Sequence, residues 1–154
     1  MAGTTRPLRA TIGATALATG LLLTAPSPAL ASDMQYSQGS CSAGPFAANY
    51  SVTYAPTTDG LNDMIYSIQW DITGPAGPRS NVEARVKEDN RLGHDKIYYT
   101  YLSQDDVKPG PQQIDLRSKG IEVPTSMRMY VEFKFAFDVK DEDDRHCTGH
   151  TRNA

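Results

Sequence analysis

Apolar side chains alternate with polar ones along much of the chain after residue 45. In four segments every second residue is apolar and its neighbours are small, polar or charged: 46–54, 64–72, 81–87 and 129–139. The alternation is clearest in the last segment, where Phe133, Phe135 and Phe137 share one face. A period of two places the apolar residues on one side of a strand, so each segment is predicted to be a half-buried β-strand.

Two shorter segments complete the predicted set of strands. Residues 97–102 are rich in β-forming residues but apolar on both faces, whereas Ile114 and Leu116 alternate with polar neighbours. The breaks between strands contain turn residues and are too short for the helical crossovers that parallel strands need. We therefore expect an all-β fold, an antiparallel β-sandwich of immunoglobulin-like or jelly-roll type with about six to seven strands.

The first 31 residues differ from the rest of the chain and predict a cleaved signal peptide. Arg6 and Arg9 form a positive start, residues 10–25 are uncharged and rich in Ala and Leu, and residues 29–31 read Ala-Leu-Ala, a pattern that signal peptidase recognises. This Ala- and Thr-rich leader resembles those of secreted proteins from high-GC Gram-positive bacteria. Cleavage is expected to release a secreted, extracellular protein that begins at Ser32.

The remaining chain shows no feature of a membrane or nucleic-acid binder. No second apolar run follows the leader, and residues 38–40 lack the apolar character of a lipoprotein signal, so no membrane attachment is expected after cleavage. A net charge of −3 gives no electrostatic reason to bind nucleic acid. We expect one β-sandwich domain at 46–147, between a loose segment at 32–45 and a tail at 148–154.

Cys41 and Cys147 lie just outside the first and last strong strands, and they are the only cysteines in the sequence. An even number of cysteines in an exported protein predicts pairing, so we expect a Cys41–Cys147 disulfide. A metal site is the alternative, because His146 and His150 add two ligand atoms. Adjacent residues of an extended chain point to opposite faces, and exported thiols tend to oxidise, so the disulfide is favoured and no cofactor is expected.

Trp70 invites comparison with immunoglobulin domains, in which a buried tryptophan packs on a disulfide between the sheets. The spacing does not match, because Trp70 lies 29 residues after Cys41 and Arg145 stands where the tyrosine corner would be. We therefore predict the sandwich architecture without assigning the family, and we expect Trp70 to be a core residue.

An acidic run follows the last long strand. Clustered carboxylates can supply the oxygen ligands that calcium prefers, so four residues are weak calcium candidates: Asp138, Asp141, Asp143 and Asp144. The run lacks the glycine and the distant glutamate of an EF-hand loop. A solvated turn is the simpler interpretation.

Tyrosines give the sequence's one indication of a binding surface. Tyr98, Tyr99 and Tyr101 share a predicted strand, so at least one of them is expected to point outward. Tyr130 lies on the polar face of the long strand, where its removal should cost little stability. Exposed rings beside hydrogen-bonding side chains can stack on sugars or anchor proteins, which gives five candidate partner-binding residues: Tyr98, Tyr101, Arg128, Tyr130 and Lys134. Tyrosine is also common in ordinary strands, so a structural role is the alternative.

No catalytic residues are predicted. The sequence has no G-x-S-x-G elbow, no H-E-x-x-H motif, no phosphate loop and no dinucleotide fingerprint. His94 and Asp95 are neighbours in a predicted loop, where adjacent residues rarely form an acid–base pair.

Three functional classes remain, and the sequence indicates no oligomeric state. The first is a non-catalytic domain that binds a glycan or a protein. The second is an inhibitor of exported hydrolases, which would present the proline-rich loop at 74–79. The third, and last in rank, is a small hydrolase without a recognisable motif.

Overall fold

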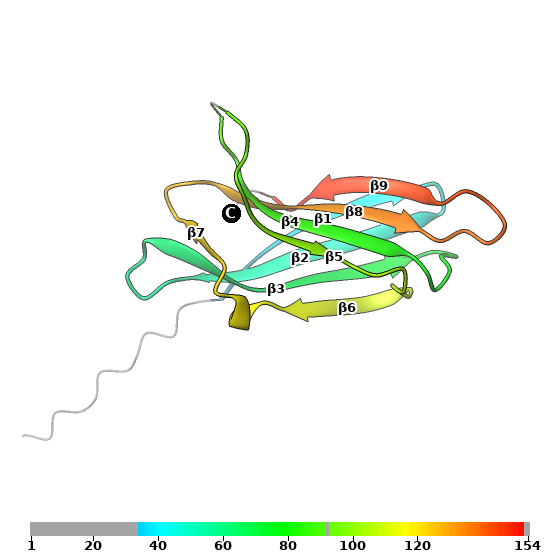
Figure 1. Cartoon of the computed structure of the whole chain (residues 1–154), viewed down its shortest axis with the longest axis horizontal. Helices are drawn as coiled ribbons and strands as arrows, with labels where there is room; N and C mark the ends of the chain where they lie inside the picture. Colours follow the sequence, from blue (N-terminus) through cyan, green and yellow to red (C-terminus); the bar gives the residue numbers. More distant parts are fainter. Residues whose placement is uncertain (1–33, 92, 153–154) are drawn as a thin grey trace, which may run out of the picture. The chain divides into compact units, whose positions relative to one another are not determined.

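The computed structural model describes residues 34–91 and 93–152, so the predicted leader at 1–31 lies outside the described residues. These residues form two antiparallel sheets that face each other in a β-sandwich (Figure 1). The predicted all-β antiparallel architecture is therefore confirmed. No helix in this part of the chain is long and apolar enough to cross a membrane.

The first sheet has five strands. They are β1 (Gln35–Ala43), β2 (Phe46–Pro56), β3 (Asn62–Thr73), β6 (Gly110–Asp115) and β7 (Glu122–Pro124). Their spatial order is β1-β2-β3-β6, and β7 pairs with the other end of β3. A short 3₁₀ helix, η1 (Arg117–Lys119), follows β6.

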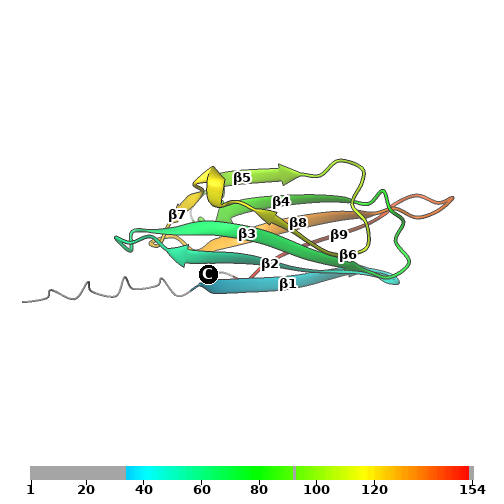
Figure 2. The ribbon, with the colours of Figure 1, turned by 90° about the horizontal axis from the view of Figure 1, so that it is seen from below.

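The second sheet has four strands: β4 (Asn81–Glu88), β5 (Ile97–Leu102), β8 (Met129–Phe137) and β9 (Arg145–His150). Their spatial order is β5-β4-β8-β9. Figure 2 shows that β5 is the outermost strand on one side of this sheet.

The described residues contain nine strands, more than the six to seven predicted, because β1, β7 and β9 were missed. The expectation of a loose segment at 32–45 is wrong, since β1 pairs with β2 from Gln35 to Ala43. The expected tail at 148–154 is wrong in part, since β9 continues to His150. Neither β1 nor β9 contains a large aliphatic side chain, so hydrophobic alternation could not reveal them.

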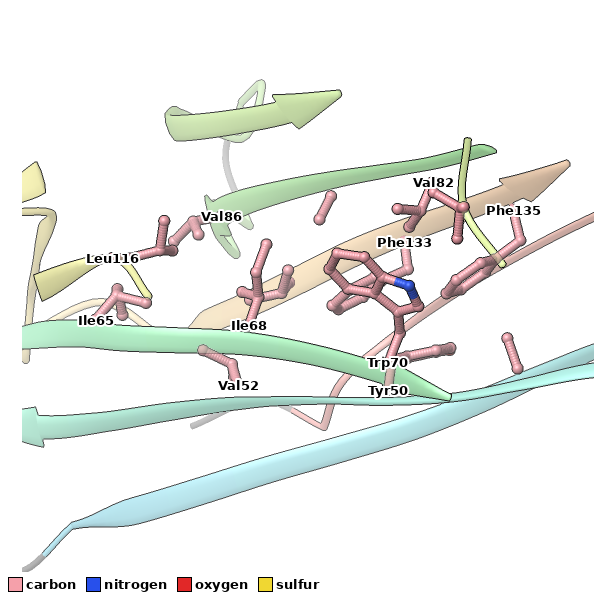
Figure 3. Packing of buried hydrophobic residues seen from close by; sticks show 14 of the residues in the cluster. Tyr50, Val52, Ile65, Ile68, Trp70, Val82, Val86, Leu116, Phe133 and Phe135 are labelled. Atoms are coloured by element: carbon pink, nitrogen blue, oxygen red, sulfur yellow. The ribbon is translucent and has the colours of Figure 1, made fainter. Parts of the chain in front are cut away.

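Inward side chains of the two sheets form the core. Phe133 of β8 stacks on Tyr50 of β2 with ring centroids 4.5 Å apart, and Phe137 stacks on Phe46 at 5.5 Å. Trp70 of β3 is 3% exposed and lies between the sheets, as predicted (Figure 3). The apolar face of each alternating segment thus supplies one side of a shared core.

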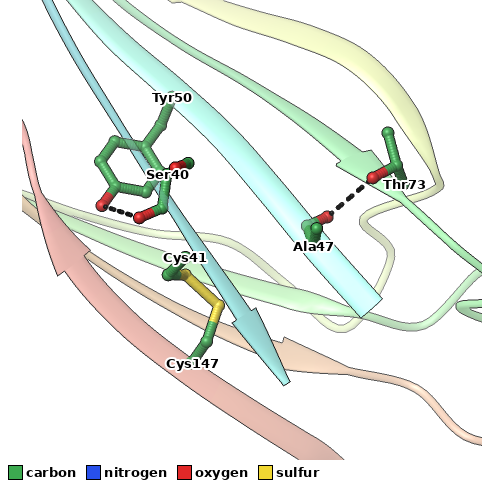
Figure 4. The surroundings of a disulfide bond; sticks show 6 residues. All are labelled: Ser40, Cys41, Ala47, Tyr50, Thr73 and Cys147. Carbon is green, nitrogen blue, oxygen red and sulfur yellow. Dashed lines mark hydrogen bonds between the residues drawn. A yellow bond between two sulfur atoms is a disulfide. The ribbon is translucent and has the colours of Figure 1, made fainter. Parts of the chain in front are cut away.

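A disulfide between Cys41 and Cys147 joins β1 to β9, as predicted (Figure 4). The two strands belong to different sheets, so the bond closes one side of the sandwich covalently. Hydrogen bonds beside it continue the closure: the Ser37 hydroxyl donates to the Arg152 carbonyl oxygen at 2.6 Å, and the Arg152 N–H donates to the Gln38 carbonyl oxygen at 3.2 Å. Both cysteines are consumed by the bond, so the four-ligand metal site considered for them is wrong.

Glycines allow β1 and β9 to approach the Tyr50 ring. A Cβ atom at Gly39 would lie 2.5 Å from Cε2 of Tyr50, and one at Gly149 would overlap the Tyr50 hydroxyl. That hydroxyl donates to the Ser40 carbonyl oxygen at 3.2 Å (Figure 4). The closed side of the sandwich therefore requires glycine at residues 39 and 149, on either side of the Tyr50 ring.

Loss of the disulfide is expected to lower the free energy of unfolding substantially. The bond spans 106 residues, and the loop-entropy relation gives about 4 to 5 kcal/mol for a loop of that size. Cys41→Ser, Cys147→Ser and the double variant should show the same lowered melting temperature in calorimetry, because each lacks the same bond. Two titratable thiols in the native protein would contradict this assignment.

Gly149→Ala is expected to lower the free energy of unfolding by about 1 to 3 kcal/mol, because the added methyl group overlaps Tyr50. Combining it with Tyr50→Phe removes the overlapped oxygen and should make the two changes cost less together than the sum of each alone. Gly93→Ala is the matched control, since its Cβ would meet its nearest atom at 3.4 Å. Urea unfolding measures the wild type and all four variants, and equal stability of Gly149→Ala and Gly93→Ala would refute the argument.

Candidate functional site

Tyr130 lies on the outer face of the four-stranded sheet, as the alternation in β8 predicts, but its ring is held by neighbours. Its hydroxyl donates to the Asp95 carboxylate, its ring centroid lies 5.7 Å from that of His150, and the Lys87 ammonium lies 5.4 Å from the ring centroid. The hydrogen bonds from Tyr130 and from the Asn90 N–H lower the pKa of Asp95. Tyr130 therefore anchors the loop between β4 and β5 to β8.

Charged side chains on the same outer face pair with one another. Lys87 lies 3.4 Å from Glu132 and 3.7 Å from Asp95. Lys134 lies 3.7 Å from Glu132 and 4.0 Å from Glu83. Alternating signs across β4 and β8 thus satisfy this surface internally, and a partner would have to displace existing ion pairs.

The tyrosines of β5 contact the core rather than projecting freely. The register between β4 and β5 shifts at Val86 and Lys87, which pair with Tyr99 and Ile97 and leave Tyr98 as an extra residue. This bulge breaks the alternation that predicted an outward tyrosine, and all three rings pack against the core cluster. Tyr98, Tyr99 and Tyr101 are therefore half-buried, and none of them is a fully exposed ring.

Individual contacts explain why the rings of Tyr98 and Tyr101 are half-buried. The Tyr98 hydroxyl donates to the buried Glu88 carboxylate at 2.6 Å, and burial with this bond raises the pKa of Tyr98 to about 12. Tyr101 faces inward, with its ring centroid 5.7 Å from that of Trp70.

The five candidate partner-binding residues therefore do not form one patch. Tyr101 is on the inner face of its sheet, Tyr98 is tied to Glu88, and Tyr130 and Lys134 share the outer face. Arg128 is exposed in the loop before β8.

Asp138 in the acidic run fastens a neighbouring loop. Its carbonyl oxygen accepts the Gly77 N–H at 2.8 Å, and its carboxylate accepts the Arg79 N–H at 3.2 Å. Among residues 34–91 and 93–152, no three acidic, histidine or cysteine side chains are placed to hold a metal ion. The calcium hypothesis for Asp138, Asp141, Asp143 and Asp144 thus gains no geometric support.

The outer face of the five-stranded sheet carries a hollow that the alternation of apolar and polar residues does not predict. Its volume is about 490 Å³. Side chains from three adjacent strands line it, with Pro111 of β6 at its border: Tyr36, Gln38 and Ser40 on β1, Asn49 and Ser51 on β2, and Gln69 and Asp71 on β3. Almost all of these side chains are polar, and Arg152 also lines the hollow, so Asp71 and Arg152 are its two charged residues.

Strand register explains why these side chains meet. Gln38 pairs with Ser51 and Ser51 with Gln69, and in the next row Asn49 pairs with Asp71. Directly paired residues of neighbouring strands face the same side of a sheet. The polar half of each alternating strand therefore accumulates into a continuous polar surface.

Several polar groups in the hollow are available to a ligand. In the described part of the chain, the side chains of Asn49, Ser51 and Asp71 have no hydrogen-bond or ion-pair partner. Tyr36 is 62% exposed, and its hydroxyl donates to Gln38 at 2.6 Å. A second hollow of about 300 Å³ shares Gln69 and adds Tyr66. This face combines two accessible tyrosines with unpaired amide, hydroxyl and carboxylate groups.

No known protein family, curated protein or solved structure matches this chain.

Because its neighbours hold the Tyr130 ring, substitutions of Tyr130 are expected to lower the free energy of unfolding more than its place on the outer face suggests. Tyr130→Phe should lower the free energy of unfolding by about 1 kcal/mol, because Asp95 loses a hydrogen bond. Tyr130→Ala should cost about 2 kcal/mol, since the contacts with His150 and Lys87 are also lost.

Tyr36→Ala is the control in the same unfolding experiment, because its ring is mostly exposed and should contribute less than about 0.5 kcal/mol. If Tyr130→Ala were as stable as this control, Tyr130 would be the free surface ring that the sequence alone suggested.

Proposed function

We propose that this chain is a secreted, extracellular and non-catalytic binding domain that recognises a glycan in the hollow of the five-stranded sheet. The observation that carries the proposal is a hollow of about 490 Å³ on a paired sheet, lined by Tyr36 and by polar side chains of which Asn49, Ser51 and Asp71 have no hydrogen-bond or ion-pair partner among the described residues. Its volume falls within the range of small-molecule sites, about 300 to 1,000 Å³.

A glycan matches the chemistry of this surface. Sugar hydroxyls both donate and accept hydrogen bonds, and the Asn49 and Gln69 amides offer both functions. Asp71 supplies a strong acceptor, and the exposed Tyr36 ring can pack on the apolar face of a sugar ring. Paired strands hold these groups in place before a ligand arrives, which reduces the entropy lost on binding.

The hollow supports binding rather than glycoside hydrolysis. Most glycosidases place two carboxylates on either side of the bond they cleave. Asp71 is the one carboxylate among the described residues that line this hollow. A single acceptor can orient a sugar, but it cannot serve as both acid and base.

Export is supported by independent features. A disulfide such as Cys41–Cys147 persists in oxidising compartments and is rare in the cytosol. The three-part leader at 1–31 would deliver the chain to such a compartment.

The loop at 74–79 supports a second candidate function, inhibition of exported hydrolases. Its N–H groups at Gly77 and Arg79 are fastened to Asp138, and two prolines restrict its backbone. Such a loop is preorganised for presentation to an enzyme cleft.

Glycan binding is tested with an array followed by titration calorimetry on the best ligand. Tyr36→Ala and Asn49→Ala should each weaken binding by about 5- to 30-fold, corresponding to 1 to 2 kcal/mol of lost contacts. Both variants should keep the wild-type melting temperature, because neither side chain is buried.

Gln104→Ala is the matched control, since Gln104 is an exposed amide outside the hollow. Unchanged affinity in both hollow variants would contradict the proposed site. Binding to no glycan, together with inhibition in a hydrolase panel that Arg79→Ala abolishes, would replace the proposal with the second candidate.

A further inference from the structure

Five strands have one unpaired edge, namely β1, β5, β6, β7 and β9, and they differ in how that edge is protected. β1 and β9 are joined by the disulfide and by hydrogen bonds. β6 contains Pro111, which has no N–H to offer, and ends at the charged Asp115, and the three-residue β7 contains Glu122 and Pro124. β5 has neither kind of protection along Ile97–Leu102, a segment without charge or proline. Such an edge is a template for another strand.

The backbone of β5 offers hydrogen bonds outward at defined residues. The Ser103 N–H donates to the Val82 carbonyl oxygen, so Ser103 bonds toward β4. Bonding direction alternates along a strand, which turns the N–H and C=O groups of Thr100 and Leu102 toward the open edge. The outer side of the strand also carries exposed aliphatic side chains: Ile97 is 46% exposed and Leu102 is 70% exposed.

We propose that β5 pairs with β5 of a second copy of this chain, antiparallel and about a two-fold axis at Thr100. Tyr99 and Tyr101 face inward, opposite Val86 and Ala84, whereas Thr100 faces outward opposite Arg85. Paired residues must face the same side, so pairing must preserve this parity. A two-fold axis at Thr100 does so, because it sets Tyr99 opposite Tyr101 of the second copy.

The ends of β5 are complementary in the same register. Leu102 and Ile97 both face outward, opposite Glu83 and Lys87. In this register Leu102 of one copy lies beside Ile97 of the other, because Tyr98 is the extra residue of the bulge, so the exposed aliphatic side chains cover each other twice. Lys96 falls opposite Gln104 and next to Asp105, which brings opposite charges together at both ends. A parallel arrangement would lack both features.

The predicted dimer joins the two four-stranded sheets into one sheet of eight strands. Its contact is short, so we expect weak association with a dissociation constant in the range of about 10 µM to 1 mM. Since β5 is the one side edge left unprotected in the described residues, pairing should stop at two copies. This inference is independent of the glycan proposal, which concerns the other sheet.

Sedimentation velocity of the purified protein over the same concentration range tests the association. The wild type should shift from monomer to dimer as concentration rises. Leu102→Lys places a cation on the edge and should abolish the shift, whereas Leu61→Lys should leave it unchanged. Leu61 is the matched control because it is 67% exposed and lies in the loop between β2 and β3.

Cysteine crosslinking tests the register. Hydrogen-bonded antiparallel partners have Cα atoms about 5.5 Å apart, within disulfide range. Thr100→Cys should therefore form a covalent dimer under mild oxidation, detected as a doubled intact mass that reductant reverses. Leu102→Cys should not, because the two copies of residue 102 would lie about 13 Å apart along the strands.

Each outcome decides the proposal. A monomer at every concentration would overturn it, as would a dimer that survives Leu102→Lys. Preferential crosslinking through Leu102→Cys would overturn the register. Growth beyond two copies would show that β5 is an aggregation edge and not a closed interface.

Discussion

Closure of β1 against β9 is the constraint on which the arrangement of the sandwich depends. The disulfide fixes the edges of two different sheets at one distance, and Gly39 and Gly149 let both strands approach the Tyr50 ring. Tyr50 in turn stacks on Phe133, so the closed side is continuous with the aromatic core. The same closure holds β1 at the margin of the first sheet, where its polar side chains extend the hollow.

The two outer faces differ in how their polar groups are used. On the four-stranded sheet, Lys87, Glu132 and Lys134 alternate in sign and neutralise one another. On the five-stranded sheet, most of the outward side chains around the hollow are uncharged, and those of Asn49, Ser51 and Asp71 have no hydrogen-bond or ion-pair partner among the described residues. The sequence pattern is similarly polar in both cases, but several hydrogen-bonding side chains on the second face have no partner.

Local patterning predicted the elements that bury large side chains on one face. The alternation in β2, β3, β4 and β8 corresponds to their inward residues, and cysteine pairing predicted the disulfide. β1 and β9 were not predicted as strands, because the residues at their inward positions are small or polar. The bulge at Tyr98 was not predicted, because it depends on the register with β4 and not on the composition of β5.

The candidate site was harder to predict than the fold for a related reason. Asn49, Ser51, Gln69 and Asp71 were visible as the polar half of two strands, which is also the pattern of an ordinary solvated face. Their significance arises only when β1 adds Gln38 and Tyr36 beside them. This pairing joins β1, which the sequence pattern did not reveal, to β2, which it did. Rules based on local sequence cannot predict such a contact between strands.

The separation of the bonded cysteines also determines when the molecule can be completed during synthesis. Adjacent strands such as β2 and β3 can pair as soon as both have been made, but the outer side of β1 waits for a strand that begins about a hundred residues later. Until then Cys41 is a thiol on an unfinished edge. Its pairing with Cys147 therefore requires that the last strand has been made and lies in register. A cellular system that retains proteins with free thiols would hold back truncated or misregistered chains on the basis of this one thiol.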